Sequence, residues 1–112
     1  MRFLKRLIVV WLLITAFDVG AAVRAQNAII YFQSTTAANT ALQLPSNVLF
    51  NGLFCVPSTS NTVQVYFGGN SSLTTSNGVA ISNGQIWYAG VSNSNQVWIY
   101  STVISTIGCW GN

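Results

Sequence analysis

The feature that most constrains this chain is the regular interruption of short apolar and aromatic runs between residues 62 and 102. Runs rich in Val, Ile, Tyr, Phe and Trp favour β-strands, and breaks rich in Gly and Asn favour tight turns. The breaks are Gly68-Gly69-Asn70, Ser76-Asn77-Gly78, Ser82-Asn83-Gly84 and Ser92-Asn93-Ser94-Asn95. This pattern predicts an all-β domain, either a small antiparallel β-sandwich or a small barrel, with about seven or eight short strands.

The expected strands follow the enrichment in β-branched and aromatic residues. Residues 62–67 alternate most clearly, with Val63, Val65 and Phe67 on one face. Residues 34–46 are expected to be extended chain or loop, because Pro45 ends any helix there. The other expected strands cover residues 28–33, 48–56, 73–75, 79–81, 85–89, 96–101 and 102–107, after which Gly108, Cys109 and Trp110 close the domain.

Asn51-Gly52 lies in the middle of the apolar run 48–56 and leaves two interpretations open. Asn-Gly is the preferred centre of a two-residue type I′ turn, so the run can be a tight hairpin. Alternatively, Gly52 marks a bulge within one buried strand.

Charge is confined to the start of the chain. The four basic residues and the one acidic residue all lie within the first 24 positions, and there is no histidine. General acid–base catalysis needs a titratable side chain near the working pH, metal sites need His, several Cys or carboxylates, and phosphate contacts need Lys or Arg. The sequence therefore predicts a non-enzymatic domain without a cofactor, a metal site or a nucleic-acid partner.

Residues 1–25 have the organisation of a secretory signal peptide. Arg2, Lys5 and Arg6 precede an apolar run at residues 7–17, and small residues follow. Eleven helical residues span about 16 Å, short of a hydrocarbon core of about 30 Å, which disfavours the alternative of an uncleaved anchor. Cleavage is expected after Ala25, or after Ala22 as the second choice. The mature chain is then one domain, residues 26–112, without a membrane span, in a secreted, periplasmic or cell-surface location.

Export makes Cys55 and Cys109 a candidate disulfide pair, because such compartments are oxidising. The alternative is two buried free thiols.

Aromatic residues concentrate in the middle and at the end of the chain. Adjacent aromatic residues on a strand point to opposite faces, so one member of each pair is expected in the core and the other at the surface. Exposed rings can stack on the faces of sugars, whereas the simpler interpretation is packing within the sandwich or within an assembly. The candidate interaction residues are Tyr66, Trp87, Tyr88, Trp98, Tyr100 and Trp110.

The uncharged body of the chain favours assembly. Net charge keeps copies of a protein apart, and lysines on edge strands block pairing between sheets. Residues 25–112 contain no charged side chain, so they carry no net charge and no edge lysine. We therefore expect an exported structural protein that forms homo-oligomers or larger assemblies, as a surface, coat or filament subunit. The alternative is an extracellular binding module, such as a small lectin, with a glycan or another surface as its partner.

Residues 65–102 add a resemblance. The order VYFGG, LTTSNGVAISNGQIWYA and QVWIYS resembles small β-sandwich modules of tailed-phage virion proteins, including head-decoration and fibre-associated modules. The resemblance implies a β-sandwich and a structural role of the virion-decoration kind.

Overall fold

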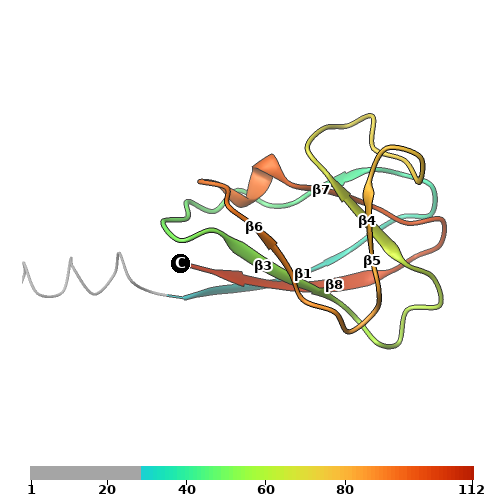
Figure 1. The fold of residues 1–112 in the computed structure, drawn as a ribbon, viewed down its shortest axis with the longest axis horizontal. Coiled ribbons are helices and arrows are strands. Elements are labelled where there is room, and N and C mark those ends of the chain that lie inside the picture. Colours follow the sequence, from blue (N-terminus) through green and yellow to red (C-terminus); the bar gives the residue numbers. More distant parts are fainter. Residues whose placement is uncertain (1–28) are drawn as a thin grey trace, which may run out of the picture.

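The computed structural model describes residues 29–112, which form two packed antiparallel sheets of four strands each (Figure 1). Sheet A has the strand order β1-β8-β3-β6 and sheet B the order β2-β7-β4-β5. One short 3-10 helix, η1 (Ser94–Gln96), precedes β7. The strands are β1 (Ile30–Thr35), β2 (Leu42–Gln43), β3 (Leu53–Pro57), β4 (Val65–Gly68), β5 (Val79–Ile81), β6 (Trp87–Ala89), β7 (Trp98–Tyr100) and β8 (Thr106–Gly111). The expected all-β sandwich is confirmed.

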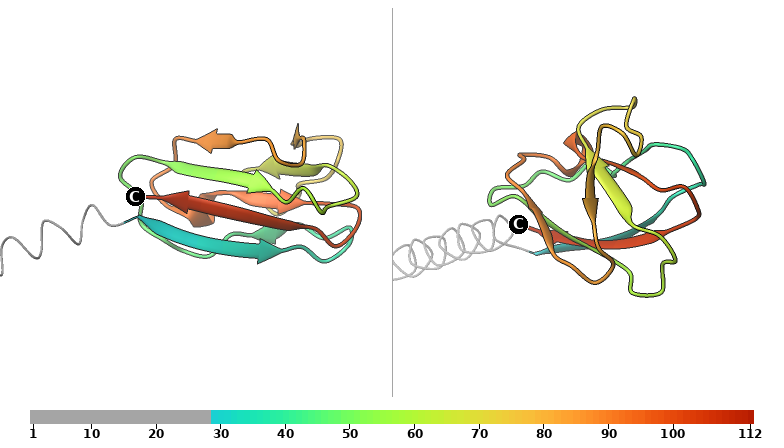
Figure 2. Two further views of the ribbon diagram at one scale, coloured as in Figure 1. Left: turned by 90° about the horizontal axis from the view of Figure 1, so that it is seen from below. Right: turned by 45° about the vertical axis from the view of Figure 1, so that its right-hand side comes forward.

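The strand order is that of a jelly roll. β1 pairs with β8, β2 with β7, β3 with β6 and β4 with β5, so the chain is one long hairpin of nested antiparallel pairs. The hairpin is rolled so that β8 also pairs with β3, and β7 with β4 (Figure 2). Eight strands arranged in two Greek keys define this architecture. Apart from β4 and β5, consecutive strands therefore belong to different sheets.

Alternation along the strands places the core between the sheets. In β3 the buried side chains are Leu53, Cys55 and Pro57, while Phe54 and Val56 point outward. β8 alternates in the same way. Because successive side chains of a strand point to opposite faces, each sheet has one core-facing side and one solvent-facing side. The buried core comprises Leu44, Leu49, Leu53, Cys55, Val65, Phe67, Ile81, Val97, Ile99, Ile107 and Cys109.

The expected disulfide joins the two central strands of sheet A. Cys55 of β3 lies directly opposite Cys109 of β8, and the two residues are 54 positions apart. Both side chains point into the core. The bond therefore fixes the pairing and the register of strands that are distant in sequence.

Several sequence-based expectations about strands are wrong, and β4, expected from residue 62, begins at Val65. Residues 73–75 are not a strand but part of the connection between β4 and β5. A Cβ atom added to Gly68 or Gly78 would lie 2.6 or 2.7 Å from a methyl carbon of Leu73, so the two glycines make room for that buried side chain beneath the β4–β5 connection.

The last strand begins four residues later than expected, at Thr106 rather than at 102, and it contains Gly108, Cys109 and Trp110. The start is delayed because Ser101 and Ser105 form a hydroxyl–hydroxyl hydrogen bond of 2.8 Å across a turn. The amide of Ser105 also donates to the hydroxyl of Thr36 at 3.1 Å.

Neither interpretation of Asn51-Gly52 is correct. Val48 forms an isolated bridge with Asn93, and β3 begins only at Leu53, so residues 48–56 form neither a hairpin nor a single bulged strand. Gly52 has a φ of +86°, in the left-handed region, and turns the chain into β3. The signal peptide expected at residues 1–25 lies outside the described residues.

Replacing both Cys55 and Cys109 with Ala should lower the free energy of unfolding by roughly 4 kcal/mol, because the unfolded chain regains the freedom of the closed loop. Urea unfolding followed by tryptophan fluorescence measures the change. Reduced parent protein is the matched control and should lose a comparable amount. An unchanged unfolding midpoint in both samples would contradict the structural role of the bond.

Candidate functional site

The outer face of sheet A carries a row of four aromatic residues, one on each strand. Tyr31 of β1 lies opposite Trp110 of β8, Trp110 opposite Phe54 of β3, and Phe54 opposite Tyr88 of β6. These residues form the aromatic row. Directly opposed side chains on one face of a sheet are close enough to contact each other. The row therefore crosses the full width of the sheet.

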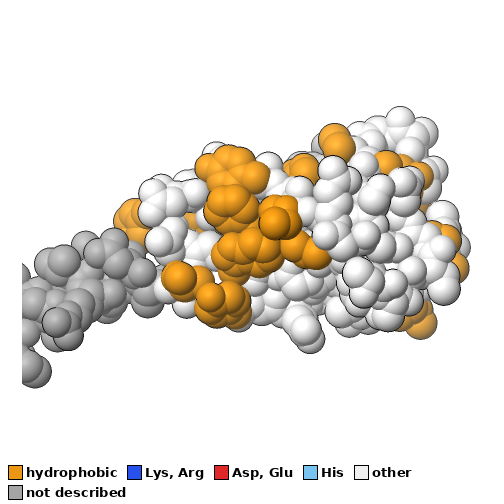
Figure 3. All heavy atoms as spheres, turned by 60° about the horizontal axis from the view of Figure 1, so that its bottom comes forward, with side chains coloured by type: hydrophobic (Ala, Val, Ile, Leu, Met, Phe, Trp, Pro, Cys, Tyr) orange, Lys and Arg blue, Asp and Glu red, His pale blue; other side chains and the backbone are white. Residues whose placement is uncertain are grey.

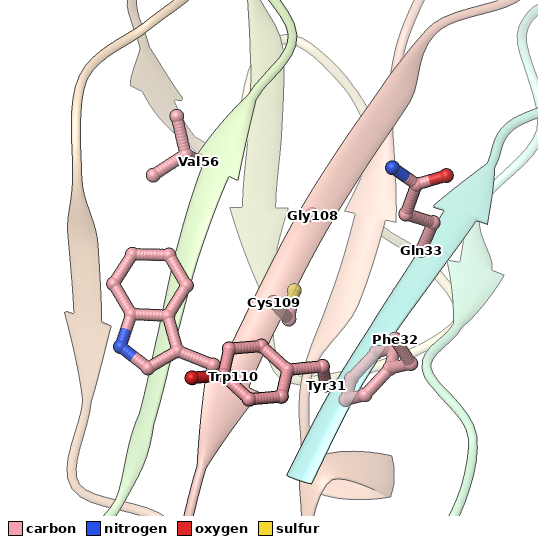
Figure 4. Close-up of a pocket in the computed structure, with 7 residues that line it drawn as sticks. All are labelled: Tyr31, Phe32, Gln33, Val56, Gly108, Cys109 and Trp110. Atoms are coloured by element: carbon pink, nitrogen blue, oxygen red, sulfur yellow. The ribbon is translucent and has the colours of Figure 1, made fainter. Parts of the chain in front are cut away.

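Three of the four rings pack against one another, and the two rings at the ends of the row are exposed. The Phe54 and Trp110 ring centroids are 5.6 Å apart and the ring planes are within 9° of parallel. Phe54 and Tyr88 are 4.8 Å apart at 48°. Figure 4 shows Tyr31 reaching over β8 and Trp110 reaching over β3. Tyr31 is 72% exposed and Tyr88 53% exposed, and Figure 3 shows hydrophobic side chains gathered in a band over this side of the molecule.

The end of the row at β6 is held by the turn before β3. The Tyr88 hydroxyl donates to the carbonyl oxygen of Asn51 at 3.2 Å. A Cβ at Gly52 would lie 2.6 Å from that hydroxyl oxygen and 2.7 Å from the carbonyl oxygen of Ala89. The absence of a side chain at Gly52 thus lets Tyr88 lie against the backbone.

A hollow adjoins the row over β8. Its volume is about 400 Å³, and Gly108 forms part of its floor. A Cβ added to Gly108 would meet no atom within 4 Å, so this position is open. Figure 4 shows Tyr31 and Trp110 at one end of the hollow and Val56 and Gln33 on its two sides. Phe32 and Cys109 complete the lining.

This face offers apolar contact surface and a few hydrogen-bonding groups. The row and the hollow offer aromatic and aliphatic surface, together with the hydroxyl of Tyr31 and the amide of Gln33 as hydrogen-bonding groups. Within residues 29–112, no group of three or more His, Cys, Asp or Glu side chains is placed to hold a metal ion. None of the helical structure in this part of the chain is long and apolar enough to cross a membrane.

The six aromatic residues singled out from the sequence are divided between the outer faces of the two sheets and the interior. Trp110 and Tyr88 belong to the aromatic row. Trp87 faces the interior and packs on Phe67, with ring centroids 4.4 Å apart. The pairs Trp87–Tyr88 and Tyr66–Phe67 therefore each place one ring in the core and the other outward, as expected.

Tyr66, Trp98 and Tyr100 lie on the outer face of sheet B. Tyr66 is opposite Tyr100, whose hydroxyl donates to the side-chain oxygen of Asn39 at 3.2 Å. Trp98 is opposite Gly68 and Gln43. Each of these three side chains is half-buried, so this face offers less accessible ring surface than the aromatic row.

Sequence reasoning missed Tyr31 and Phe54, half of the row. A signal for Phe54 existed, because an antiparallel pairing of Cys55 with Cys109 places residue 54 opposite residue 110. Tyr31 had no comparable local signal, because its neighbour Trp110 is distant in sequence.

No family model, curated protein or solved structure matches this chain.

Replacing Gly52 with Ala should destabilise the domain by about 2 kcal/mol or more, because alanine is strained at this φ and its Cβ would collide with Tyr88 and the Ala89 backbone. Thermal and urea unfolding measure the loss. Gly69→Ala is the matched control, since a Cβ there would meet nothing within 4 Å. Equal stability of the two variants would show that Gly52 does not support the row.

Proposed function

We propose that this chain is an exported, non-enzymatic structural protein that assembles with copies of itself as a surface, coat or filament subunit. The observation that carries the proposal is the aromatic row: four rings lie across the outer face of sheet A, and the two terminal rings, Tyr31 and Tyr88, are more than half exposed. Contiguous exposed apolar surface is a mark of interaction sites, and aromatic rings are enriched at their centres.

The uncharged surface supports self-association. Residues 29–112 contain no Lys, Arg, Asp, Glu or His, so two copies meet without repulsion between charged side chains. In Figure 3 no charged side chain appears among the described residues around the band of hydrophobic side chains. A partner recognised by charge complementarity finds no matching charge on this domain, whereas a second copy meets a surface of the same character.

Architecture and disulfide are compatible with this role. Jelly rolls form viral coat domains and lectins, an analogy that by itself selects neither function. The Cys55–Cys109 disulfide fits an oxidising compartment outside the cytoplasm. The tailed-phage resemblance of residues 65–102 supports a virion-decoration-like role as a more specific form of the proposal.

We expect protein expressed from the full sequence to form oligomers at micromolar concentrations, with an intact mass that reports whether residues 1–25 have been removed. Replacing Tyr31 and Tyr88 with Ser should weaken association by roughly 2 kcal/mol or more, because two exposed rings are lost from the contact. Sedimentation velocity over a concentration series measures the effect, and negative-stain microscopy shows whether the assemblies are ordered.

The matched control is Ile104→Ser, which removes another exposed apolar side chain, 70% accessible, from the connection between β7 and β8. This variant should assemble like the parent. A parent protein that stays monomeric at high micromolar concentration would defeat the proposal. If Ile104→Ser weakened association as much as the tyrosine substitutions, the aromatic row would not be the assembly contact.

The hollow over Gly108 favours a second candidate function, recognition of a glycan. Flat rings beside an amide and a hydroxyl are the groups that stack on a sugar ring and hydrogen-bond to its hydroxyls. Of the three tryptophans among the candidate interaction residues, Trp110 borders the hollow, whereas Trp87 and Trp98 do not line it.

Under this second candidate, Gly108→Val should weaken glycan binding, because the valine side chain would project into the hollow from its open floor. β-Branched residues suit strands, so the fold should be retained. A glycan array screened with the parent and the variant provides the measurement, and Gly69→Ala serves as the control. A parent that binds no glycan on the array would leave assembly as the sole proposal.

A further inference from the structure

The longest edge strand of the two sheets is β1, and no other strand of residues 29–112 pairs with its outer side. The four edge strands are β1 and β6 of sheet A and β2 and β5 of sheet B. β1 has six residues, whereas the other three have two or three. Short edges limit pairing with other chains, as do lysines and prolines. β1, with the sequence IYFQST, has none of these protections.

The hydrogen bonds to β8 determine which backbone groups of β1 are free. The amide of Thr36 donates to the carbonyl oxygen of Ser105 at 2.8 Å, in continuation of the β1–β8 register. Hydrogen-bonded pairs alternate with non-bonded pairs in an antiparallel ladder. Ser34, Phe32 and Ile30 therefore direct their backbone groups toward β8, and Tyr31, Gln33 and Thr35 direct theirs away from the sheet.

The ladder between β3 and β8 agrees with this assignment, because residues of β8 that bond to β1 cannot also bond to β3. The amide of Ser58 donates to the carbonyl oxygen of Thr106 at 3.0 Å, which places Cys55 and Cys109 in a non-bonded pair. Their Cα atoms are 4.1 Å apart, and non-bonded pairs are the closer type, at about 4.5 Å.

We infer that two copies of this chain pair edge to edge through β1, antiparallel about a two-fold axis at Gln33. In this register Gln33 opposes Gln33 of the second copy, and Tyr31 opposes Thr35 in both directions. All three outward-directed residues of β1 then exchange both of their backbone hydrogen bonds, so the contact is self-complementary. Opposed residues also share a face, which keeps the outer faces of the two sheets continuous.

The occupant is a second copy because residues 29–112 carry no charged side chain, and because the two-fold register satisfies the same three residues on both sides. The result is one eight-stranded sheet made from two four-stranded halves. This inference rests on the proposed function, self-assembly, and specifies one of its contacts.

The test compares Gln33→Pro with Gln33→Ala in protein expressed from the full sequence. Proline removes the outward-directed N–H and leaves the β8 ladder intact, whereas alanine removes the side chain and keeps the N–H. We expect the dissociation constant of the dimer, measured by sedimentation, to rise at least tenfold with proline and to stay near the parent value with alanine. Contact through the side-chain face would make the two variants behave alike.

Amide hydrogen exchange of the parent supplies a readout that needs no substitution. The amides of Tyr31, Gln33 and Thr35 should be protected at concentrations where the protein associates and exchange rapidly when it is diluted. Phe32 and Ser34 should be protected in both conditions, because their amides bond to β8. This pattern keeps the inference testable if the proline variant does not fold.

The outcomes separate the two proposals. Association with freely exchanging Tyr31, Gln33 and Thr35 amides, or with equal effects of proline and alanine, overturns the edge pairing and leaves the proposed function in place. A second outcome is a dimer that is weakened by Gln33→Pro, forms no larger assemblies and is unaffected by Tyr31→Ser and Tyr88→Ser. This outcome supports the edge pairing and overturns the structural role of the row. A parent that is monomeric at all concentrations overturns both.

Discussion

The pairing of β3 with β8 is the constraint on which the rest of the structure depends. Cys55 and Cys109 are bonded within the core, so their strands are locked in one register. A shift by one residue would turn every side chain of a strand to the opposite face. The register that buries the two sulfur atoms therefore also places Phe54 opposite Trp110 on the outer face. Tyr31 of β1 and Tyr88 of β6 extend that pair into the aromatic row.

Hydrogen bonds of neutral side chains, rather than ion pairs, stabilise the connections between the strands of the described residues. Asn61 donates to the carbonyl oxygen of Thr106 and accepts from its amide, both at 2.9 Å. Asn83 donates to the carbonyl oxygens of Asn61 and Val63. Among the described residues, no buried side-chain nitrogen or oxygen lacks a partner. These asparagines shape the turns, whereas the aromatic row is the surface on which the proposed self-assembly rests.

Local patterns in the sequence were sufficient for the fold class but not for the site. Alternation at Val65 and Phe67, the turn residues and the cysteine pair all act over short distances or through one covalent link, and these predictions are confirmed. The nested strand order depends on contacts between distant segments, so the position of Tyr31 beside Trp110 could not be predicted. The strand predicted at Leu73 is wrong for another reason. β-Propensity favoured a strand there, but Gly68 and Gly78 leave room for the Leu73 side chain beneath the β4–β5 connection.

The nesting of β1 with β8 brings the two ends of the described chain together. Ile30 lies opposite Gly111, one pair beyond Tyr31 and Trp110, and Figure 2 shows both ends leaving the same side of the sandwich. Neighbouring antiparallel strands are only about 5 Å apart. A short linker could therefore join residue 112 to residue 29, and new termini could be opened in an exposed turn such as residues 75–77 to give a circular permutant with the same sheets.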